Sequence, residues 1–179
     1  MSKNILIIST SPRKGGNSDT LAEEFARGAR ETGNQVEKIA LYNKTIGFCK
    51  GCLACQKSLH CVIHDDADTI AQKMLTADVI VFATPIYYYE MCGQMKTMLD
   101  RANPLFPADY AFRDIYLLAA AADTDKSAMD GAIKGLEGWI ACFEKARLAG
   151  TVFGGGADAI GTIQGNPALK DAYEMGKRV

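Results

Sequence analysis

The stretch NILIISTSPRKGGNSDT, residues 4–20, decides the fold expected for this chain. It begins with the apolar run of residues 5–8, which is typical of a strand buried on both faces in a parallel sheet. A short polar loop follows, and from Leu21 onward apolar residues recur at helical spacing. A strand, loop and helix in this order point the free N–H groups and positive dipole end of the helix at the loop. The stretch therefore predicts a phosphate site.

The loop differs from both common nucleotide-binding fingerprints. It has neither the G-x-G-x-x-G spacing of dinucleotide sites nor the G-x-x-x-x-G-K-S/T spacing of the P-loop. Its hydroxyl, amide and guanidinium groups suit the several acceptor oxygens of a terminal monophosphate. These groups belong to Ser9, Thr10, Ser11, Arg13, Asn17 and Ser18. The alternative is an ordinary turn in which Asn17 or Ser18 caps the helix.

Outward from this stretch, apolar runs alternate with helical patterns. Further strands are predicted at residues 36–41, 79–82, 115–122 and 151–153, with helices over 65–75, 94–102, 127–145 and 167–177. This alternation predicts one α/β domain over residues 1–179, with a doubly wound five-stranded parallel sheet of order 2-1-3-4-5 in three layers, α/β/α. Because that order reverses between the first and third strands, the loops after residues 8 and 82 should lie side by side and bind a ligand.

Composition narrows the classes of function. The net charge of −1 offers no basic face for nucleic acid, so we expect no such partner. No apolar run approaches the roughly 20 residues of a membrane helix, and the chain leads directly into a strand, so we expect a cytoplasmic protein without a membrane partner. In that compartment its six cysteines are better explained as metal ligands, redox groups or core residues than as disulfides.

The most specific pattern is C-x2-C-x2-C-x5-C, formed by Cys49, Cys52, Cys55 and Cys61. A short irregular loop with x2 spacings can turn three thiolates toward one cubane, and the fourth closes the site. Structural zinc sites more often use two separated C-x-x-C pairs, so zinc and a dithiol loop are the alternatives. Outside the motif, we expect Cys92 and Cys142 in the core, and His60 and His64 at the surface.

The loop after the third strand, TPIYYYEMCGQMKTMLDR at residues 84–101, carries three consecutive tyrosines. They supply flat apolar surface with polar tips, and Pro85 fixes the backbone so that amides can face a heteroaromatic ring. The alternative is that one tyrosine caps the core while the others cover the surface. Asp100 and Arg101 are expected to form a structural ion pair at a helix end, and the glycines at 154–156 to form a plain loop.

Three stretches resemble the flavodoxin-like NAD(P)H-dependent FMN reductases, and in particular the iron-sulfur flavoproteins. SPRKGGNSDTL resembles their FMN phosphate loop, residues 84–101 resemble their P-x-Y-x-x-x-x-x-x-Q-M-K-x-x-x-D-R stretch, and the cysteine motif resembles their [4Fe–4S] motif. The resemblance implies FMN phosphate contacts from Ser9, Ser11, Arg13, Asn17 and Ser18, ring contacts from Pro85, Ile86, Tyr87 and Tyr88, and four cysteine ligands. The third flavin loop of that family is often richer in glycines or hydroxyls than residues 119–125, where Ala122 is the expected contact.

The resemblance also implies a function. FMN would accept hydride from NAD(P)H or single electrons, the cluster would take one electron at a time, and flavin N5 would react without a side-chain acid or base. Donor and acceptor would be small molecules or small redox proteins. We expect a homodimer or homotetramer in which the cysteine loop of one subunit approaches the flavin of another. The alternatives are a cluster-free NAD(P)H-dependent FMN, quinone or nitro-compound reductase, and a non-enzymatic flavodoxin-like or zinc-bearing interaction module.

Overall fold

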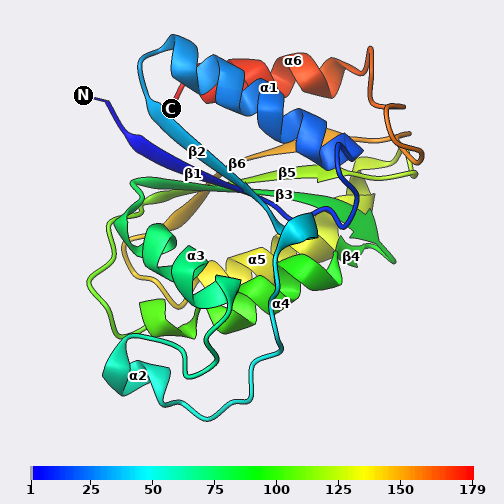
Figure 1. Ribbon diagram of the computed structural model, residues 1–179. Coiled ribbons are helices and arrows are strands. Elements are labelled where there is room, and N and C mark those ends of the chain that lie inside the picture. The colour runs from blue at the N-terminus through cyan, green and yellow to red at the C-terminus, as the bar shows by residue number, and fades with distance from the viewer. Residues whose placement is uncertain (1) are drawn as a thin grey trace.

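The computed structural model describes residues 2–179 and places a parallel sheet between two layers of helices (Figure 1). Its strand order is β2-β1-β3-β5-β6. The strands are β1 (Asn4–Ser9), β2 (Gln35–Ala40), β3 (Val79–Tyr87), β5 (Asp114–Ala120) and β6 (Arg147–Gly154). These five parallel strands confirm the predicted doubly wound sheet and its order. The numbering differs because a short additional strand, β4 (Glu90–Met91), pairs antiparallel with the end of β3 and was not predicted.

Two groups of helices cover the sheet (Figure 1). On one face lie α1 (Asn17–Glu31) and α6 (Pro167–Lys177), and on the other lie α3 (Asp66–Thr76), α4 (Gly93–Arg101) and α5 (Asp130–Ile140). The short elements are η1 (Leu41–Asn43), α2 (Cys55–Ser58), η2 (Asn103–Leu105) and η3 (Lys126–Met129). The helix predicted to reach residue 145 ends at Ile140, because the chain turns there to reach β6 at Arg147.

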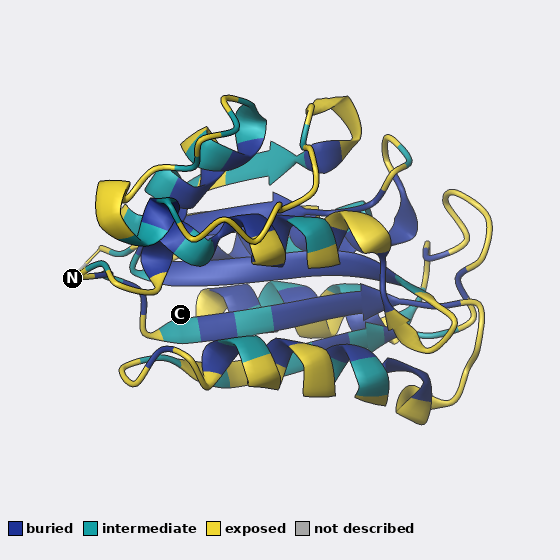
Figure 2. Cartoon of the chain, turned by 90° about the horizontal axis from the view of Figure 1, so that it is seen from below, coloured by how far each residue is buried: buried dark blue, intermediate teal, exposed yellow. Residues whose placement is uncertain are grey.

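The apolar run of β1 is buried on both faces, as the sequence predicts. Leu6 and Ile8 belong to the core beneath α3, α4 and α5, whereas Ile5 and Ile7 belong to the core beneath α1 and α6. Alternation along a strand sends successive side chains to opposite faces, so one short segment contributes to both cores. Figure 2 shows the strands of the sheet largely in dark blue, between helices whose outer faces are largely yellow.

Helices α1 and α6 approach each other at two glycines. A methyl group on Gly28 would overlap the backbone carbonyl of Tyr173, and one on Gly176 would overlap the carbonyl of Phe25. The reciprocal contact lets the two helix backbones touch, so this face of the sheet is covered by a tightly packed helix pair. Within residues 2–179, no helix has the length and hydropathy needed to cross a membrane.

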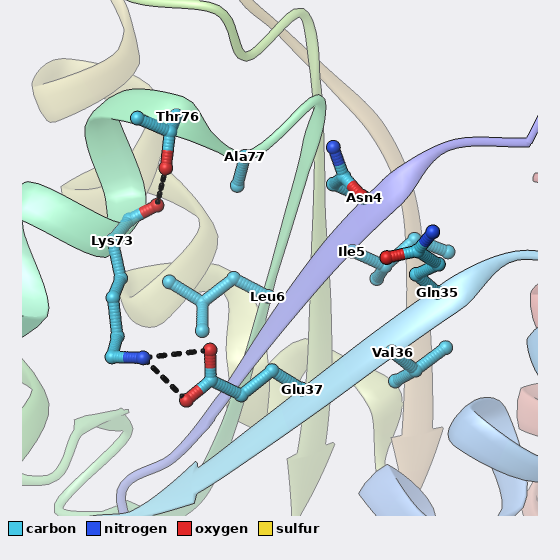
Figure 3. Close-up of a pocket in the computed structure, with 9 residues that line it drawn as sticks. All are labelled: Asn4, Ile5, Leu6, Gln35, Val36, Glu37, Lys73, Thr76 and Ala77. Carbon is cyan, nitrogen blue, oxygen red and sulfur yellow. Dashed lines mark hydrogen bonds and ion pairs between the residues drawn. The ribbon is translucent and has the colours of Figure 1, made fainter.

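A hollow of about 420 Å³ opens beside the amino ends of β1 and β2 (Figure 3). Lys73 of α3 reaches across it and forms an ion pair with Glu37 of β2, with 2.8 Å between Nζ and Oε1. Asn4 and Gln35, the first residues of the two strands, also line it. The hollow lies at the opposite end of the sheet from the expected ligand site and contains none of the predicted site residues.

Candidate functional site

The loops after β1 and β3 meet at the carboxyl edge of the sheet, where the strand order reverses. The amide of Thr10 donates to the carbonyl of Ala83 at 2.8 Å, and the hydroxyl of Thr10 donates to the same oxygen at 2.9 Å. Thr10 is completely buried, so its hydroxyl holds the two loops together and is not available to a phosphate. Thr10 is therefore removed from the phosphate donors that the sequence suggested.

A buried polar cluster of Thr10, Thr84 and Cys92 fixes the same junction. The thiol of Cys92 donates to the carbonyl of Thr10 at 3.2 Å, and the amide of Cys92 donates to the hydroxyl of Thr84 at 3.1 Å. Cys92 is fully buried, as expected for a core cysteine. The cluster was missed by sequence reasoning, because its members come from three separate segments. It locks the start of α4 against the loop after β1.

The polar loop offers anion donors at the start of α1. Gly16 precedes the helix, and no side chain caps this helix end among residues 2–179. The Ser18 hydroxyl is buried and has no hydrogen-bond partner in the described part of the chain. A Cβ on Gly16 would lie 2.5 Å from Ser11 Oγ, so glycine is needed for the tight turn. An uncapped helix start with a buried, unpaired hydroxyl fits a phosphate group.

Two predicted phosphate ligands, Asn17 and Arg13, contact a neighbouring loop. Asn17 Oδ1 accepts from the amide of Gly161 at 3.0 Å, and Asn17 Nδ2 donates to the carbonyl of Ala159 at 2.8 Å. Both ends of the Asn17 amide are therefore occupied by residues 159–161. Arg13 Nη2 donates to the carbonyl of Asp158 at 3.1 Å, although Arg13 Nε is buried without a partner among residues 2–179. Sequence reasoning identified polar side chains here but not the loop that they hold.

The remaining predicted flavin residues lie at the same edge. Ser9 is the last residue of β1 and is buried, as is Pro85 in β3, whereas Ile86 is half-buried. Ala122 is exposed, two residues beyond the end of β5. Its loop is fixed to the end of β6, because the amide of Ala121 donates to the carbonyl of Gly154 at 3.1 Å. The ends of β1, β3, β5 and β6 thus converge on one edge.

Tyr87 is the last residue of β3, Tyr88 and Tyr89 form the turn of the β3–β4 hairpin, and none of the three is buried. Their exposed fractions are 41% for Tyr87, 100% for Tyr88 and 62% for Tyr89. Tyr88 and Tyr89 have φ values of +50° and +63°, a left-handed pair that two-residue hairpins usually fill with Asn and Gly. Gly131 of α5 supports the tip, since a side chain there would overlap the carbonyl of Tyr89. The hairpin therefore displays aromatic surface at the cost of backbone strain.

The four motif cysteines line one cavity of about 430 Å³. Apolar side chains complete its wall, from Leu99, Phe106, Trp139 and Phe143. Cys49 and Cys52 are exposed on an irregular segment, whereas Cys61 is half-buried and Cys55, at the start of α2, is buried. No three Cys, His, Asp or Glu side chains within residues 2–179 converge closely enough to hold a metal ion. Four thiols therefore line one cavity, but they do not lie close enough together to hold a single metal ion.

Cys142 also lines this cavity and is exposed, contrary to the expectation of core packing. The reason is that α5 ends at Ile140, so Cys142 lies in the turn that leaves the helix. His60 and His64 are exposed, as expected. His60 Nδ1 lies 3.0 Å from Asp68 Oδ2, and the amide of Cys61 donates to Asp68 Oδ1 at 2.7 Å. Asp68 at the start of α3 thereby fixes the end of the cysteine motif.

A buried ion pair holds both ends of the cysteine loop. Arg101 is 1% exposed and forms two 2.8 Å hydrogen bonds with the carboxylate of Asp65. It also donates to the carbonyl of Gly47 at 2.7 Å, before the motif, and to that of Ile63 at 3.0 Å, after it. The predicted partner Asp100 is wrong, because Asp100 pairs with Lys96 at the surface instead. Arg101 is thus a structural clamp on residues 47–63.

The clamp changes the acid-base behaviour of its carboxylate. Although burial raises the pKa of Asp65, hydrogen bonds from Arg101 and from the amides of Gly47 and Ala67 outweigh it and hold that pKa below its ordinary value. The hydrogen bonds with Asp65 raise the pKa of Arg101 in turn. Both side chains are therefore charged at neutral pH.

Comparisons with known proteins agree with this architecture. The family model described as NADPH-dependent FMN reductase matches residues 3–154. An iron-sulfur flavoprotein from Methanosarcina thermophila is 29% identical over 169 residues, which cover 94% of this chain and 85% of that protein. An iron-sulfur flavoprotein from Methanocaldococcus jannaschii is 38% identical over 101 residues, which cover 56% of this chain and only 52% of that protein.

Solved structures show the same fold. The NAD(P)H:quinone oxidoreductase from Methanothermobacter marburgensis matches with a TM-score of 0.77 at 17% sequence identity. The match covers 99% of this chain and 96% of that one. At this identity the likeness concerns the arrangement of strands and helices alone.

Proposed function

Since the chain belongs to the NADPH-dependent FMN reductase family and has its flavodoxin-like fold, we propose that this FMN-dependent oxidoreductase also carries a [4Fe–4S] cluster. It would move electrons between a reduced donor, with NAD(P)H as one candidate, and a small acceptor. The observation that carries the proposal is the cavity lined by Cys49, Cys52, Cys55 and Cys61. When both groups are bound, FMN exchanges one or two electrons and the cluster exchanges one, so together they couple two-electron transfer to one-electron transfer.

The protein residues supply binding and orientation for FMN. The amides at the start of α1 and the hydroxyl of Ser18 would hold the phosphate. Ser11, whose hydroxyl donates to the carbonyl of Arg13 and accepts from its amide, would shape the loop, and Asn17 would position the adjoining one. The ring would lie along Pro85 and the exposed tyrosines of the hairpin, in line with the aromatic surface that it presents. No acid-base side chain is assigned, and the flavin N5 atom is the proposed reactive position.

Replacement of Ser18 by alanine is expected to weaken FMN binding about 10- to 100-fold, because a hydrogen bond to a charged group contributes about 1.5–3 kcal/mol. The dissociation constant can be measured from quenching of flavin fluorescence during titration of the apoprotein. Thr20→Val is the matched control, because the Thr20 hydroxyl donates to the carbonyl of Gly16 within the same helical turn. Equal affinities for Ser18→Ala and the wild-type protein would contradict the proposed phosphate site.

Replacement of Cys52 by alanine is expected to remove the cluster and leave FMN binding largely intact, because Cys52 lines the cysteine cavity away from the phosphate loop. Protein purified without oxygen should contain about four irons and four acid-labile sulfides per flavin, with broad absorbance over the flavin bands. Cys142→Ala is the control, since Cys142 lines the same cavity outside the motif. Iron content that is unchanged in Cys52→Ala would reject the ligand assignment.

The second candidate is a cluster-free NAD(P)H-dependent FMN, quinone or nitro-compound reductase. It is favoured by one observation, that no three metal-binding side chains converge within residues 2–179. Flavin without iron, together with direct NAD(P)H oxidation, would establish this alternative. Zinc in place of iron, without turnover with any donor, would favour an interaction module.

We also propose that the chain works as a homodimer or homotetramer. Large apolar side chains lie exposed on and around the cysteine loop, with exposed fractions of 81% for Phe48, 57% for Leu53, 52% for Val62 and 54% for Phe106. Apolar surface of this kind is typical of an interface. A contact here would bring the cysteine loop of one subunit against another copy and would shield the cluster from solvent.

A further inference from the structure

The turn after α4 places an amide donor on a motif cysteine. Asn103 is the first residue of η2, and its Nδ2 donates to Cys55 Sγ at 3.2 Å. Cys55 is the only motif cysteine that is buried, at 8% exposure. The most enclosed candidate ligand is therefore also the one with a side-chain hydrogen bond to its sulfur.

The geometry of η2 fixes this donor. The carbonyl of Asn103 accepts from the amide of Phe106 at 3.2 Å, and Pro104 restricts the backbone that follows. A neutral thiol is only a weak acceptor. A metal-bound thiolate carries negative charge and accepts a stronger, charge-assisted bond. The Asn103 donor is therefore better matched to a ligated sulfur than to a free thiol.

A second N–H donor lies in the same short segment. Arg101 Nε is buried and has no hydrogen-bond partner within residues 2–179. An unpaired donor is thus present in the last residue of α4, two residues before Asn103.

We propose that Asn103 is a positioning residue that orients Cys55 and raises the reduction potential of the cluster. This inference rests on the cluster assignment proposed above. One-electron reduction makes the cluster and its thiolates more negative without breaking a bond. An N–H donor to the sulfur stabilises the reduced state more than the oxidised state, and hydrogen bonds to sulfur are among the determinants of cluster potential. Asn103 thereby favours transfer of an electron onto the cluster.

The test is a reductive titration of the holoprotein without oxygen, with the reduced cluster followed by electron paramagnetic resonance. In Asn103→Leu, the ratio of reduced to oxidised cluster at a fixed potential is expected to fall on the order of tenfold, because one hydrogen bond is lost. Tenfold corresponds to about 59 mV for a one-electron couple. Asn103→Asp should lower the ratio further, since it replaces the donor with a negative charge.

Gln72→Leu is the matched control. Gln72 Nε2 donates to the carbonyl of Leu59 at 2.8 Å, so this variant removes an amide from the same loop without touching a sulfur, and its cluster potential should equal that of the wild-type protein. If Asn103→Leu does not hold iron, Asn103→Asp, which keeps the side-chain size, gives the same measurement. A cluster with wild-type potential in the Asn103 variants overturns the inference. A wild-type protein without iron overturns the proposed function instead.

Discussion

Replacement of Arg101 by methionine is expected to lower the free energy of unfolding by about 3–5 kcal/mol, measured by urea denaturation followed by circular dichroism. The substitution leaves the Asp65 carboxylate, whose side chain is 9% exposed, without a counter-charge and with only the amides of Gly47 and Ala67 as donors. It also removes the donors to the carbonyls of Gly47 and Ile63. The cysteine loop would lose the clamp at both of its ends.

The Lys96–Asp100 pair provides the matched control. It lies at i,i+4 on the same helix, but its side chains are 62% and 48% exposed. Lys96→Met should therefore change the free energy of unfolding by less than about 0.5 kcal/mol. Similar losses in the two variants would show that burial of the Arg101 pair does not determine its contribution.

The effect of Arg101→Met should also depend on pH. In the wild-type protein the pKa of Asp65 is lowered on folding, so the pair stabilises the protein above the unfolded pKa of about 4 and loses this contribution as pH falls through the folded pKa. In the variant the bonds from Arg101 are lost while burial still opposes the charge, so the folded pKa of Asp65 is higher than in the wild-type protein and acid neutralises the carboxylate sooner. The difference in unfolding free energy between the two proteins should therefore shrink as the pH falls below about 4.

Gly28→Ala is expected to destabilise the protein by about 2–3 kcal/mol, measured in the same way. The added methyl group would overlap the carbonyl of Tyr173, a backbone atom that cannot rotate away. Helices α1 and α6 would have to separate and open the core that they cover. This loss exceeds the gain of about 1 kcal/mol that alanine brings to a helix interior.

Gly138→Ala separates the effect of steric overlap from that of helix propensity. Gly138 lies in α5, and an added Cβ there would have no neighbouring heavy atom within 4 Å. The substitution should stabilise the protein by about 0.5–1 kcal/mol, because only the helix propensity changes. A neutral or stabilising Gly28→Ala would mean that α1 and α6 adjust their spacing freely.

The sheet could be predicted because its signals are local. The apolar runs in β1 and β3 are buried on both faces, and such runs separated by helical patterns have one favoured topology. The β3–β4 hairpin could not be predicted in this way, since its left-handed turn holds Tyr88 and Tyr89 rather than Asn and Gly. Packing of the tip on α5 overrides the local preference.

The candidate site could be predicted only where its residues lie close together in the sequence at a characteristic spacing. The cysteine motif is such a case, and its cysteines do line one cavity. Arg101 was assigned to Asp100 because the two are adjacent, but its partner Asp65 lies 36 positions away. The hydrogen-bond partner of Asn17, Gly161, was likewise not predicted, since it lies 144 positions away. Polar side chains can be recognised in a sequence, but their hydrogen-bond partners in distant segments cannot.

The contact between α1 and α6 also constrains how the chain is made. Ala168 and Ala172 of α6 complete the core that contains Ile5 and Ile7, so the part of this face that α1 does not cover stays exposed until residues 167–177 have been synthesised. A nascent chain that has already formed every strand still exposes apolar surface on the ribosome. Chaperones that bind such surface can therefore act until α6 has left the exit tunnel and packed beside α1.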